Sequence, residues 1–278
     1  MNIIHLKETL KTALNEDLGF GDLSSELIFN ASNESRGQFK AKAEGVLCGT
    51  DLITATYELL EADAEVVLHK ADGDSIAKGE IIADVHGPTG LLLQAERNIL
   101  NLMQHLSGIA TATAECVELL NDDHIRICDT RKTLPGLRML QKYAVRCGGG
   151  YNHRFRLDDG VMIKDNHIKA AGGISQAVNT VRASLGHMVK IEVETETRDQ
   201  VLECADLGVD VIMFDNRTPN EVKEWTQMIP DGIITEVSGG IRPENIAAYK
   251  NCGADYISLG WLSHSVKALD ISFNLIDS

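Results

Sequence analysis

The sequence predicts a mixed α/β protein of two domains, and three observations support this. The chain of 278 residues is longer than one ordinary domain, and 44% hydrophobic residues suffice to bury substantial cores. The second half repeats short apolar runs with polar or glycine-rich tails, at the interval that one strand plus one helix occupies. The first half lacks this repeat and mixes helix patterns with strand patterns.

The first domain is expected to span residues 1–118 and to begin with a helix. Leucines recur every four residues among charged ones, which predicts an amphipathic helix and not a signal peptide; they are Leu6, Leu10, Leu14 and Leu18. This helix should stop at Gly19, and the turn formers of residues 19–25 predict a loop.

The rest of the first domain alternates strand and helix patterns. Residues 36–49 and 64–88 show short strand patterns interrupted by turn signals, on either side of a predicted helix near 51–61. Residues 90–120 are rich in apolar side chains and predict one long helix, or two helices separated near Ser107 and Gly108.

The second domain is expected to span residues 119–265 and to be a βα repeat. Its six apolar runs are IRICDTRK, VMIKDN, VKIEVET, VIMFDN, IITEVSGG and YISLGW. Right-handed crossovers in such a repeat bring the C-terminal ends of all strands to one edge. Six units are too few for an ordinary eight-unit barrel, so an incomplete barrel fits best and a doubly wound open sheet is the alternative.

Composition excludes several classes of function. A net charge of −15 argues against nucleic acid as the main partner, because binding to a duplex requires many surface cations. Six scattered cysteines without a CxxC pair indicate reduced thiols, not a zinc site or a disulfide framework. Without an apolar run of 18 residues a membrane span is not expected, and a cytoplasmic location is the default.

Cations are concentrated in residues 129–167, although the protein is acidic. This stretch holds eight of the 26 Lys and Arg residues but only four of the 41 Asp and Glu residues. Arg131, Lys132 and Lys164 directly follow predicted strands, so their side chains should enter the cleft at the sheet edge. Like charges confined there repel one another and need a counter-anion, which predicts a small polyanionic ligand.

Other strand ends supply complementary groups. Glu194 and Asp215 end neighbouring strands, and two carboxylates at one edge can hold Mg²⁺. The glycine-containing strand ends at 238–240 and 259–265 suit a phosphate group. His153 and His167 are either acid–base or structural residues, Asp158 with Asp159 is either a catalytic pair or a turn, and Gly148–Gly150 either admits an anion or makes a turn.

These residues together resemble the quinolinate phosphoribosyltransferase family. The motifs that carry the resemblance are EDLGFGDLSS, AERNILNLMQHLSGIAT, DTRKTLPGLRMLQKYAVRCGGGYNHR, IKDNHI, IEVET, FDN, EVSGGI and ISLGWLSHS, in family order from residue 16 to residue 265. The resemblance implies an N-terminal α/β sandwich followed by an incomplete α/β barrel of six to seven strands. It also implies that the tail, residues 266–278, packs back on the first domain.

The resemblance also implies a reaction and an assembly. Family members join quinolinate to 5-phosphoribosyl 1-pyrophosphate with Mg²⁺, releasing pyrophosphate and CO2 and giving nicotinate mononucleotide in de novo NAD biosynthesis. They form homodimers or larger homo-oligomers whose active sites are shared across the subunit interface, with no nucleic acid or membrane involved.

Roles carried over residue by residue complete the expected site. The catalytic residues would be Lys132, Lys164, Glu194 and Asp215, the last two also holding the metal. The residues that bind substrate would be Arg97 (donated by the neighbouring subunit), Thr130, Arg131, Lys132, His153, Arg154, Lys164, Ser238, Gly239, Gly240, Gly260 and His264. Arg156 and Trp261 depart from the family pattern, where glycine and a small residue are usual.

Three rival functions follow from the same residues. Another phosphoribosyltransferase could use a different pyridine or aromatic acid. A Schiff-base aldolase could use Lys164 as its nucleophile, although the surrounding cations disfavour this chemistry. A non-catalytic anion sensor would have no need of both metal-type carboxylates.

Overall fold

The computed structural model describes residues 1–30 and 32–276 and forms two compact units. The first unit comprises Met1–Ala114, Thr133–Gly149 and the C-terminal segment from Leu262, and the second comprises Glu115–Lys132 and Gly150–Trp261. Within the described residues, no helix combines the length and apolar character required to cross a membrane.

The first unit is a sheet domain with helices packed against it. Its strands are β1 (Glu34–Ala41), β2 (Gly45–Val46), β3 (Glu65–Leu68), β4 (Ser75–Ile76), β5 (Ile81–Pro88) and β12 (Ile271–Ile276). Its helices are α1 (Ile3–Leu18), α2 (Leu23–Ile28), α3 (Asp51–Leu59), α4 (Thr89–Leu120), α5 (Arg138–Cys147) and α11 (Trp261–His264), of which α4 and α11 cross the boundary between the units.

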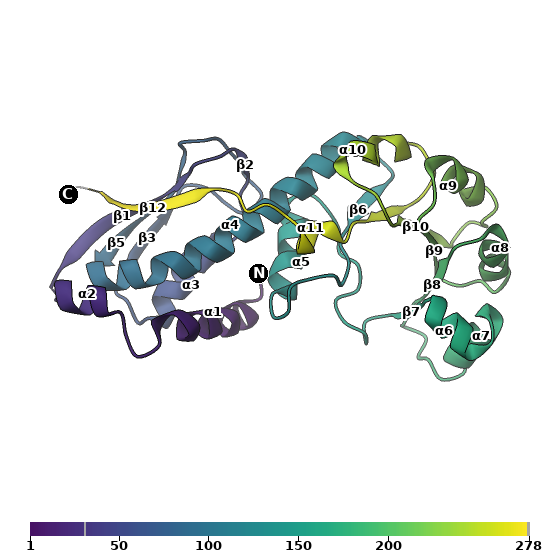
Figure 1. Ribbon diagram of the computed structural model, residues 1–278, viewed down its shortest axis with the longest axis horizontal. Helices are drawn as coiled ribbons and strands as arrows, with labels where there is room; N and C mark the ends of the chain where they lie inside the picture. The colour runs from purple at the N-terminus through teal and green to yellow at the C-terminus, as the bar shows by residue number, and fades with distance from the viewer. Residues whose placement is uncertain (31, 277–278) are drawn as a thin grey trace. The chain divides into compact units, whose positions relative to one another are not determined.

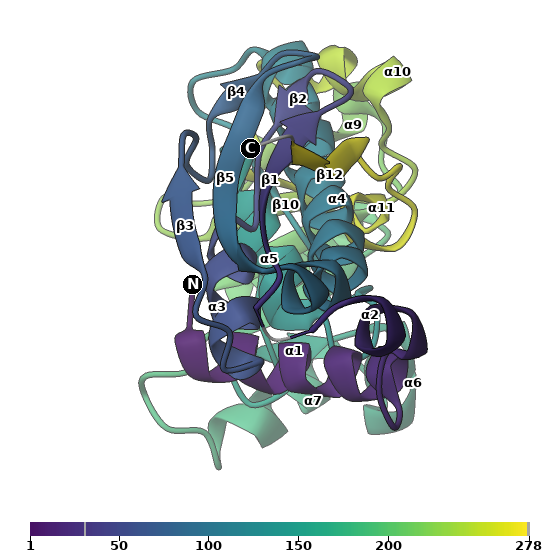
Figure 2. The same cartoon turned by 90° about the vertical axis from the view of Figure 1, so that its left-hand side faces the viewer.

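The main sheet of the first unit has four antiparallel strands in the order β12, β1, β5 and β3. Figure 2 shows this sheet on the side that faces the viewer. The C-terminal strand β12 pairs with β1, and the rings of Phe39 and Phe273 on these strands lie 4.8 Å apart between centroids. Leu6 and Leu10 of α1 belong to the same buried core. Burying such side chains stabilises the unit by about 1.5–3 kcal/mol each.

The N-terminal helix forms as its leucine pattern predicts, but the loop after it is shorter. The Asn2 side chain accepts hydrogen bonds from two backbone N–H groups and begins α1. The loop predicted at 19–25 ends at Asp22, because this carboxylate accepts from the N–H groups of Ser24 and Ser25 and begins α2.

Residues 89–120 form one helix, so the alternative of a helix pair is wrong. Ser107 does not break the helix, because its hydroxyl bonds to the backbone of Cys48. Gly108 lies where a Cβ atom would be 2.3 Å from the carbonyl oxygen of Lys267. Both residues therefore permit close packing on α4 and do not end it.

The second unit is a six-stranded parallel sheet, which confirms an incomplete α/β barrel. Its strands pair in the order β6 (Arg126–Cys128), β11 (Tyr256–Ser258), β10 (Ile234–Ser238), β9 (Val211–Asp215), β8 (Ile191–Thr195) and β7 (Val161–Ile163), and the sheet is not closed. Its helices are α6 (Asp165–Ala171), α7 (Ile174–Arg182), α8 (Arg198–Asp206), α9 (Pro219–Thr226), α10 (Pro243–Ile246) and the 3₁₀ turn Ala247–Tyr249.

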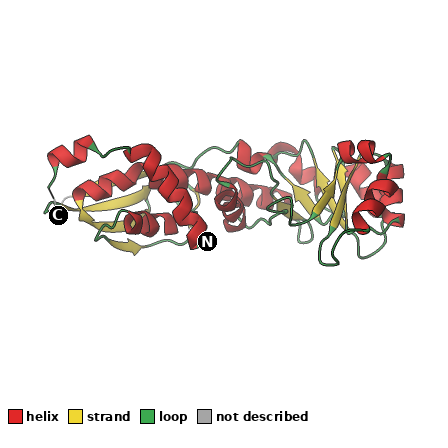
Figure 3. Cartoon of the chain, turned by 90° about the horizontal axis from the view of Figure 1, so that it is seen from below, coloured by secondary structure: helices red, strands yellow, loops and turns green. Residues whose placement is uncertain are grey.

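The helices of the second unit lie outside its sheet. Figure 1 shows α7, α8 and α9 along the outer side of the strands, and Figure 3 shows the same alternation of helix and strand in two colours. Because all six strands run in one direction, their C-terminal ends share one edge, where ligands bind in this type of fold.

Candidate active site

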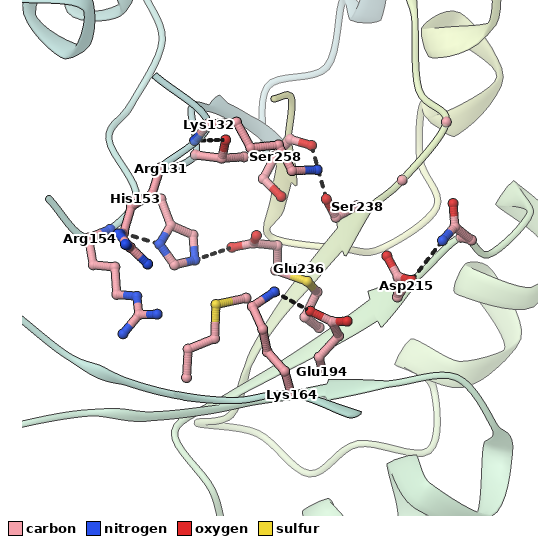
Figure 4. A pocket seen from close by; sticks show the side chains of 16 residues that line it. Arg131, Lys132, His153, Arg154, Lys164, Glu194, Asp215, Glu236, Ser238 and Ser258 are labelled. Atoms are coloured by element: carbon pink, nitrogen blue, oxygen red, sulfur yellow. Dashed lines mark hydrogen bonds and ion pairs between the residues drawn. The ribbon is translucent and has the colours of Figure 1, made fainter. Parts of the chain in front are cut away.

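A cavity of about 600 Å³ opens at the C-terminal edge of the parallel sheet, entirely within the second unit (Figure 4). Its wall combines cationic side chains, two strand-end carboxylates and a glycine-containing loop. The lining residues are Thr130, Arg131, Lys132, His153, Arg154, Met162, Lys164, Glu194, Met213, Asp215, Asn216, Glu236, Ser238, Gly239, Gly240 and Ser258.

Eleven of the residues predicted for the site line this cavity. They are Thr130, Arg131, Lys132, His153, Arg154, Lys164, Glu194, Asp215, Ser238, Gly239 and Gly240. Gly260 is not a lining residue, but it packs closely against one, because a Cβ atom there would be 2.7 Å from Cδ of Lys132. Arg97 and His264 belong to the first unit and do not line the cavity, so their expected roles stay predictions.

Lys164 and Glu194 form an ion pair within the cavity. The Nζ atom of Lys164 donates to Oε2 of Glu194 over 2.6 Å. Lys164 directly follows β7, and Glu194 is the penultimate residue of the neighbouring strand β8. The carboxylate is largely covered while the lysine is half exposed. A cation expected to bind substrate and an acid expected to hold metal are thus paired with each other.

Arg131 and Arg154 supply the guanidinium groups of the cavity. Among the described residues, the buried Nε atoms of both arginines have no hydrogen-bond partner. Burial, and next the charge of Arg131, lowers the pKa of Arg154. One Nη atom of Arg154 donates to the Gly160 carbonyl over 2.6 Å, which fixes the orientation of the guanidinium group. Two close guanidinium groups with unused donors suit an anionic ligand.

His153 is held at both ring nitrogens. Its Nδ1 accepts from the backbone N–H of Arg154 over 2.8 Å, and its Nε2 lies 2.9 Å from the Glu192 carboxylate and 3.8 Å from that of Glu236. Its own backbone N–H donates to Asp129, which also accepts from the Asn152 amide.

Glu192 and Glu236 are buried acids on the inner face of the sheet. Only 6% and 4% of their respective surfaces are exposed, and each has one carboxylate oxygen without a hydrogen-bond partner among the described residues. Burial, followed by the charge of Glu192, raises the pKa of Glu236 to about 7. The cavity therefore rests on a carboxyl group that carries a proton more readily than an exposed glutamate.

The loop at 238–240 presents backbone to the cavity. Gly239 has φ = +93° and Gly240 has φ = +65°, conformations that favour glycine. A Cβ atom on Gly239 would lie 2.3 Å from Oδ1 of Asn216, so the close packing of Asn216 leaves no room for a side chain at this position. Successive turns of this kind expose N–H groups to an anion such as a phosphate.

Five lining residues were not predicted from the sequence, namely Met162, Met213, Asn216, Glu236 and Ser258. Four of them precede a predicted strand-end residue by two positions, as Glu236 precedes Ser238. Alternate residues of a strand share a face, so this spacing could have identified the four residues as further lining residues. Asn216 follows β9 with φ = +56°, which the sequence does not reveal.

Several alternatives from the sequence resolve as structural features. Asp159 accepts from the N–H groups of Phe155 and Arg156, which is a turn and not a catalytic arrangement. His167 accepts from the N–H of Lys164 and caps α6. A Cβ atom on Gly148 would be 2.3 Å from the Ala110 carbonyl, so this glycine serves packing.

The two departures from the family pattern also have structural partners. Arg156 is exposed and forms ion pairs with Asp158 and Asp159 at 3.3 and 3.7 Å, and it does not line the cavity. Trp261 donates from Nε1 to the Ile241 carbonyl, and the Arg242 guanidinium lies 5.6 Å from its ring. Neither residue removes a polar group from the cavity wall.

Glu194 and Asp215 fit a magnesium site by donor type. Both are carboxylates at adjacent strand ends, both line the cavity, and hard oxygen donors are what Mg²⁺ prefers. Asp215 accepts from the Asn216 amide at one oxygen, and Glu194 accepts from Lys164. Each carboxylate therefore retains capacity for a further ligand.

Two family models match adjacent parts of the chain. The model of the quinolinate phosphoribosyl transferase N-terminal domain matches residues 22–107, and that of the C-terminal domain matches residues 109–274. Together they cover most of the sequence.

Curated and solved proteins are similar over nearly the whole length. A probable nicotinate-nucleotide pyrophosphorylase [carboxylating] of Bacillus subtilis is 53% identical over 275 residues, covering 99% of this chain and 95% of that protein. A quinolinate phosphoribosyltransferase [decarboxylating] of Nicotiana tabacum is 38% identical, with coverages of 97% and 82%. The NadC structure of Streptococcus pyogenes superposes with a TM-score of 0.95 at 39% identity, with coverages of 100% and 99%.

Proposed function

This chain belongs to the quinolinate phosphoribosyltransferase family, and we propose that the cavity of its second unit carries out the family reaction. The enzyme transfers the phosphoribosyl group of 5-phosphoribosyl 1-pyrophosphate to quinolinate with loss of CO2. The products are nicotinate mononucleotide, pyrophosphate and CO2, and the reaction belongs to NAD biosynthesis.

The observation that carries this proposal is the composition of one cavity wall. Arg131, Lys132, Arg154 and Lys164 face a space that Glu194 and Asp215 also border. Both substrates are polyanions, and two arginine forks with buried, unpartnered Nε atoms suit the carboxylates of quinolinate.

The chain's own residues act mainly by positioning and electrostatics. As pyrophosphate leaves, positive charge develops at C1 of the ribose, which the carboxylates of Glu194 and Asp215 stabilise. Lys132 and Lys164 offset the negative charge of the leaving group. Holding the pyridine nitrogen against C1 converts an encounter of two substrates into a reaction within one complex. The loop at 238–240 binds the 5′-phosphate through backbone N–H groups.

The cofactor is proposed to be Mg²⁺, held by Glu194 and Asp215. When bound, it would supply Lewis-acid neutralisation of the departing pyrophosphate. Asp215→Asn should raise the Mg²⁺ concentration that gives half-maximal activity, whereas Asp199→Asn, on the exposed surface of α8, should leave it unchanged.

The assembly is proposed to be a homodimer or larger homo-oligomer. The first unit exposes an apolar surface on α2 and the preceding loop, formed by Phe20, Leu23, Leu27 and Ile28. A second copy of the chain is the proposed cover for this surface, since such patches mark interfaces. Arg97, exposed and paired only loosely with Glu96 at 3.7 Å, is available to enter a neighbour's cavity.

The location is proposed to be the cytoplasm. Within the described residues, none of the six cysteines forms a disulfide, and Cys48, Cys147 and Asp72 lie close enough together to be candidate ligands of one metal ion. Thiols persist in that state in reducing compartments.

One assay tests the proposed function. The protein is incubated with quinolinate, 5-phosphoribosyl 1-pyrophosphate and Mg²⁺, and release of CO2 and formation of nicotinate mononucleotide are followed together. Equal amounts of both products are expected. Turnover of nicotinate in preference to quinolinate, or phosphoribosyl transfer without CO2, would assign the chain to a different transferase.

A further inference from the structure

The ring of His153 is positioned so that it cannot exchange protons freely with a substrate. Its Nδ1 accepts the backbone N–H of Arg154 over 2.8 Å, and two N–H groups cannot face each other in one hydrogen bond, so Nδ1 carries no proton. The remaining nitrogen, Nε2, then carries the proton and donates it to Glu192 over 2.9 Å. The network therefore selects a neutral ring with one tautomer.

The two carboxylates beside the ring lie close together and are buried, which disfavours two negative charges there. Oxygen atoms of Glu192 and Glu236 and a nitrogen of His153 all lie within 4.8 Å of one another. One oxygen of each carboxylate is buried without a partner of good geometry among the described residues, and the Ser258 hydroxyl faces Glu236. A proton placed between these groups supplies a donor that two ionised carboxylates would lack.

We propose that Glu236 is a positioning residue of this enzyme: it keeps a proton up to neutral pH, and together with Glu192 it holds His153 as a neutral, Nε2-protonated ring. The inference rests on the proposed function and assigns His153 a binding role instead of proton transfer. The raised pKa of Glu236 agrees with this geometry.

The arrangement serves the binding of a dianion. Glu236 lines the cavity, so an ionised carboxylate there would repel the carboxylates of quinolinate. As a neutral acid it adds no charge beneath the ligand. The fixed ring of His153 in turn orients the backbone of Arg154, whose guanidinium enters the cavity.

The protonation state of His153 is tested directly by NMR of protein labelled with ¹⁵N-histidine. The resonances of His153 are assigned by their loss in His153→Gln. Between about pH 6 and pH 8, where an ordinary histidine titrates, the ring should remain in the Nε2-protonated form. A doubly protonated ring or the Nδ1-protonated tautomer in this range would overturn the proposal.

Kinetics of Glu236 variants test its role in the reaction. Glu236→Gln preserves a neutral side chain of the same shape, whereas Glu236→Ala removes it. We expect the alanine variant to raise KM for quinolinate about tenfold more than the glutamine variant does, with a smaller effect on kcat. Glu224→Gln, an exposed replacement on α9, is the matched control.

The pH profile separates this role from simple packing. Above about pH 7 the wild-type KM for quinolinate should rise as Glu236 loses its proton, and Glu236→Gln should flatten that rise. The charged and titratable groups that face Glu236 are His153, Glu192 and Asp129, and none is altered in this variant. Equal pH profiles in the two proteins, or equal damage from glutamine and alanine, would overturn the proposal.

The outcomes distinguish this inference from the proposed function. If wild-type protein forms no nicotinate mononucleotide, the proposed function fails, and the NMR result still reports on the His153 network. If the enzyme is active but His153 titrates as an ordinary histidine, only the inference fails.

Discussion

Lys164 and Glu194 form an ion pair at the C-terminal edge of the parallel sheet, with Nζ and Oε2 separated by 2.6 Å. The pair joins the cationic part of the cavity to its carboxylate part. The proposed substrate and metal would each compete with this contact, because a polyanion binds a group such as Lys164 and a cation binds a group such as Glu194. Within the cavity the two charges thus offset each other.

Lys164→Ala should reduce kcat/KM by about 100-fold, because it removes a cation from the cavity and leaves Glu194 without its partner. Steady-state kinetics with quinolinate measure the effect, and circular dichroism checks that the fold is retained. Lys169→Ala, on the exposed face of the adjacent helix α6, is the control. Activity within about twofold of wild type in Lys164→Ala would place the site elsewhere.

Arg131→Ala should likewise abolish most turnover while the fold remains intact. Its guanidinium lines the cavity and has a buried Nε without a partner among the described residues. Arg156→Ala is the matched arginine control, since Arg156 pairs with Asp158 outside the cavity. Isothermal titration with quinolinate should show lost binding only in the first variant, and similar binding by both would contradict the assignment.

Gly239→Ala should impair binding of 5-phosphoribosyl 1-pyrophosphate and lower stability more than Gly172→Ala does. Both glycines have positive φ, so each replacement introduces backbone strain of about 1 kcal/mol. Only at Gly239 does the added Cβ atom also collide with Asn216, whereas Gly172 faces open space. Thermal unfolding and the KM for the phosphoribosyl donor measure the difference, and equal effects would show that the collision is relieved without cost.

Glu236→Gln should change how stability depends on pH. The pKa of Glu236 is raised from 4.5 to about 7 in the folded protein, so between these values the folded state holds a proton that the unfolded state lacks. The free energy of unfolding contributed by this group therefore falls as pH rises through that window. Urea unfolding at about pH 5 and pH 8 should show a smaller decline in Glu236→Gln than in wild type, and parallel declines would argue against a proton on Glu236.

Mixing two impaired variants tests the shared active site. Arg97→Ala should lose most activity if this arginine enters a neighbour's cavity, and Lys164→Ala should lose most activity through its own cavity. Mixed oligomers would contain one cavity with both residues intact, so activity should return on mixing after mild dissociation. Sedimentation velocity confirms the assembly, and no recovery from a mixed oligomer would contradict donation of Arg97 across the interface.

The sequence by itself determined the repeating part of the fold and the charges of the site. Each of the six apolar runs became a parallel strand, because near-continuous apolar segments are buried on both faces of such a sheet. Strand direction then placed residues as distant in sequence as Arg131 and Ser238 around one cavity. The family resemblance, carried by local motifs, was confirmed by the matches to both domains.

Only the tertiary structure decided which groups touch. Local patterns do not specify that Lys164 meets Glu194, that Nδ1 of His153 accepts from Arg154, or that Glu236 lies beneath the ring. These contacts depend on the register of neighbouring strands and on loop conformations with positive φ, as at Asn216, which are set by packing between segments far apart in sequence. The raised pKa of Glu236 has the same origin, because burial and nearby charge are properties of the folded chain.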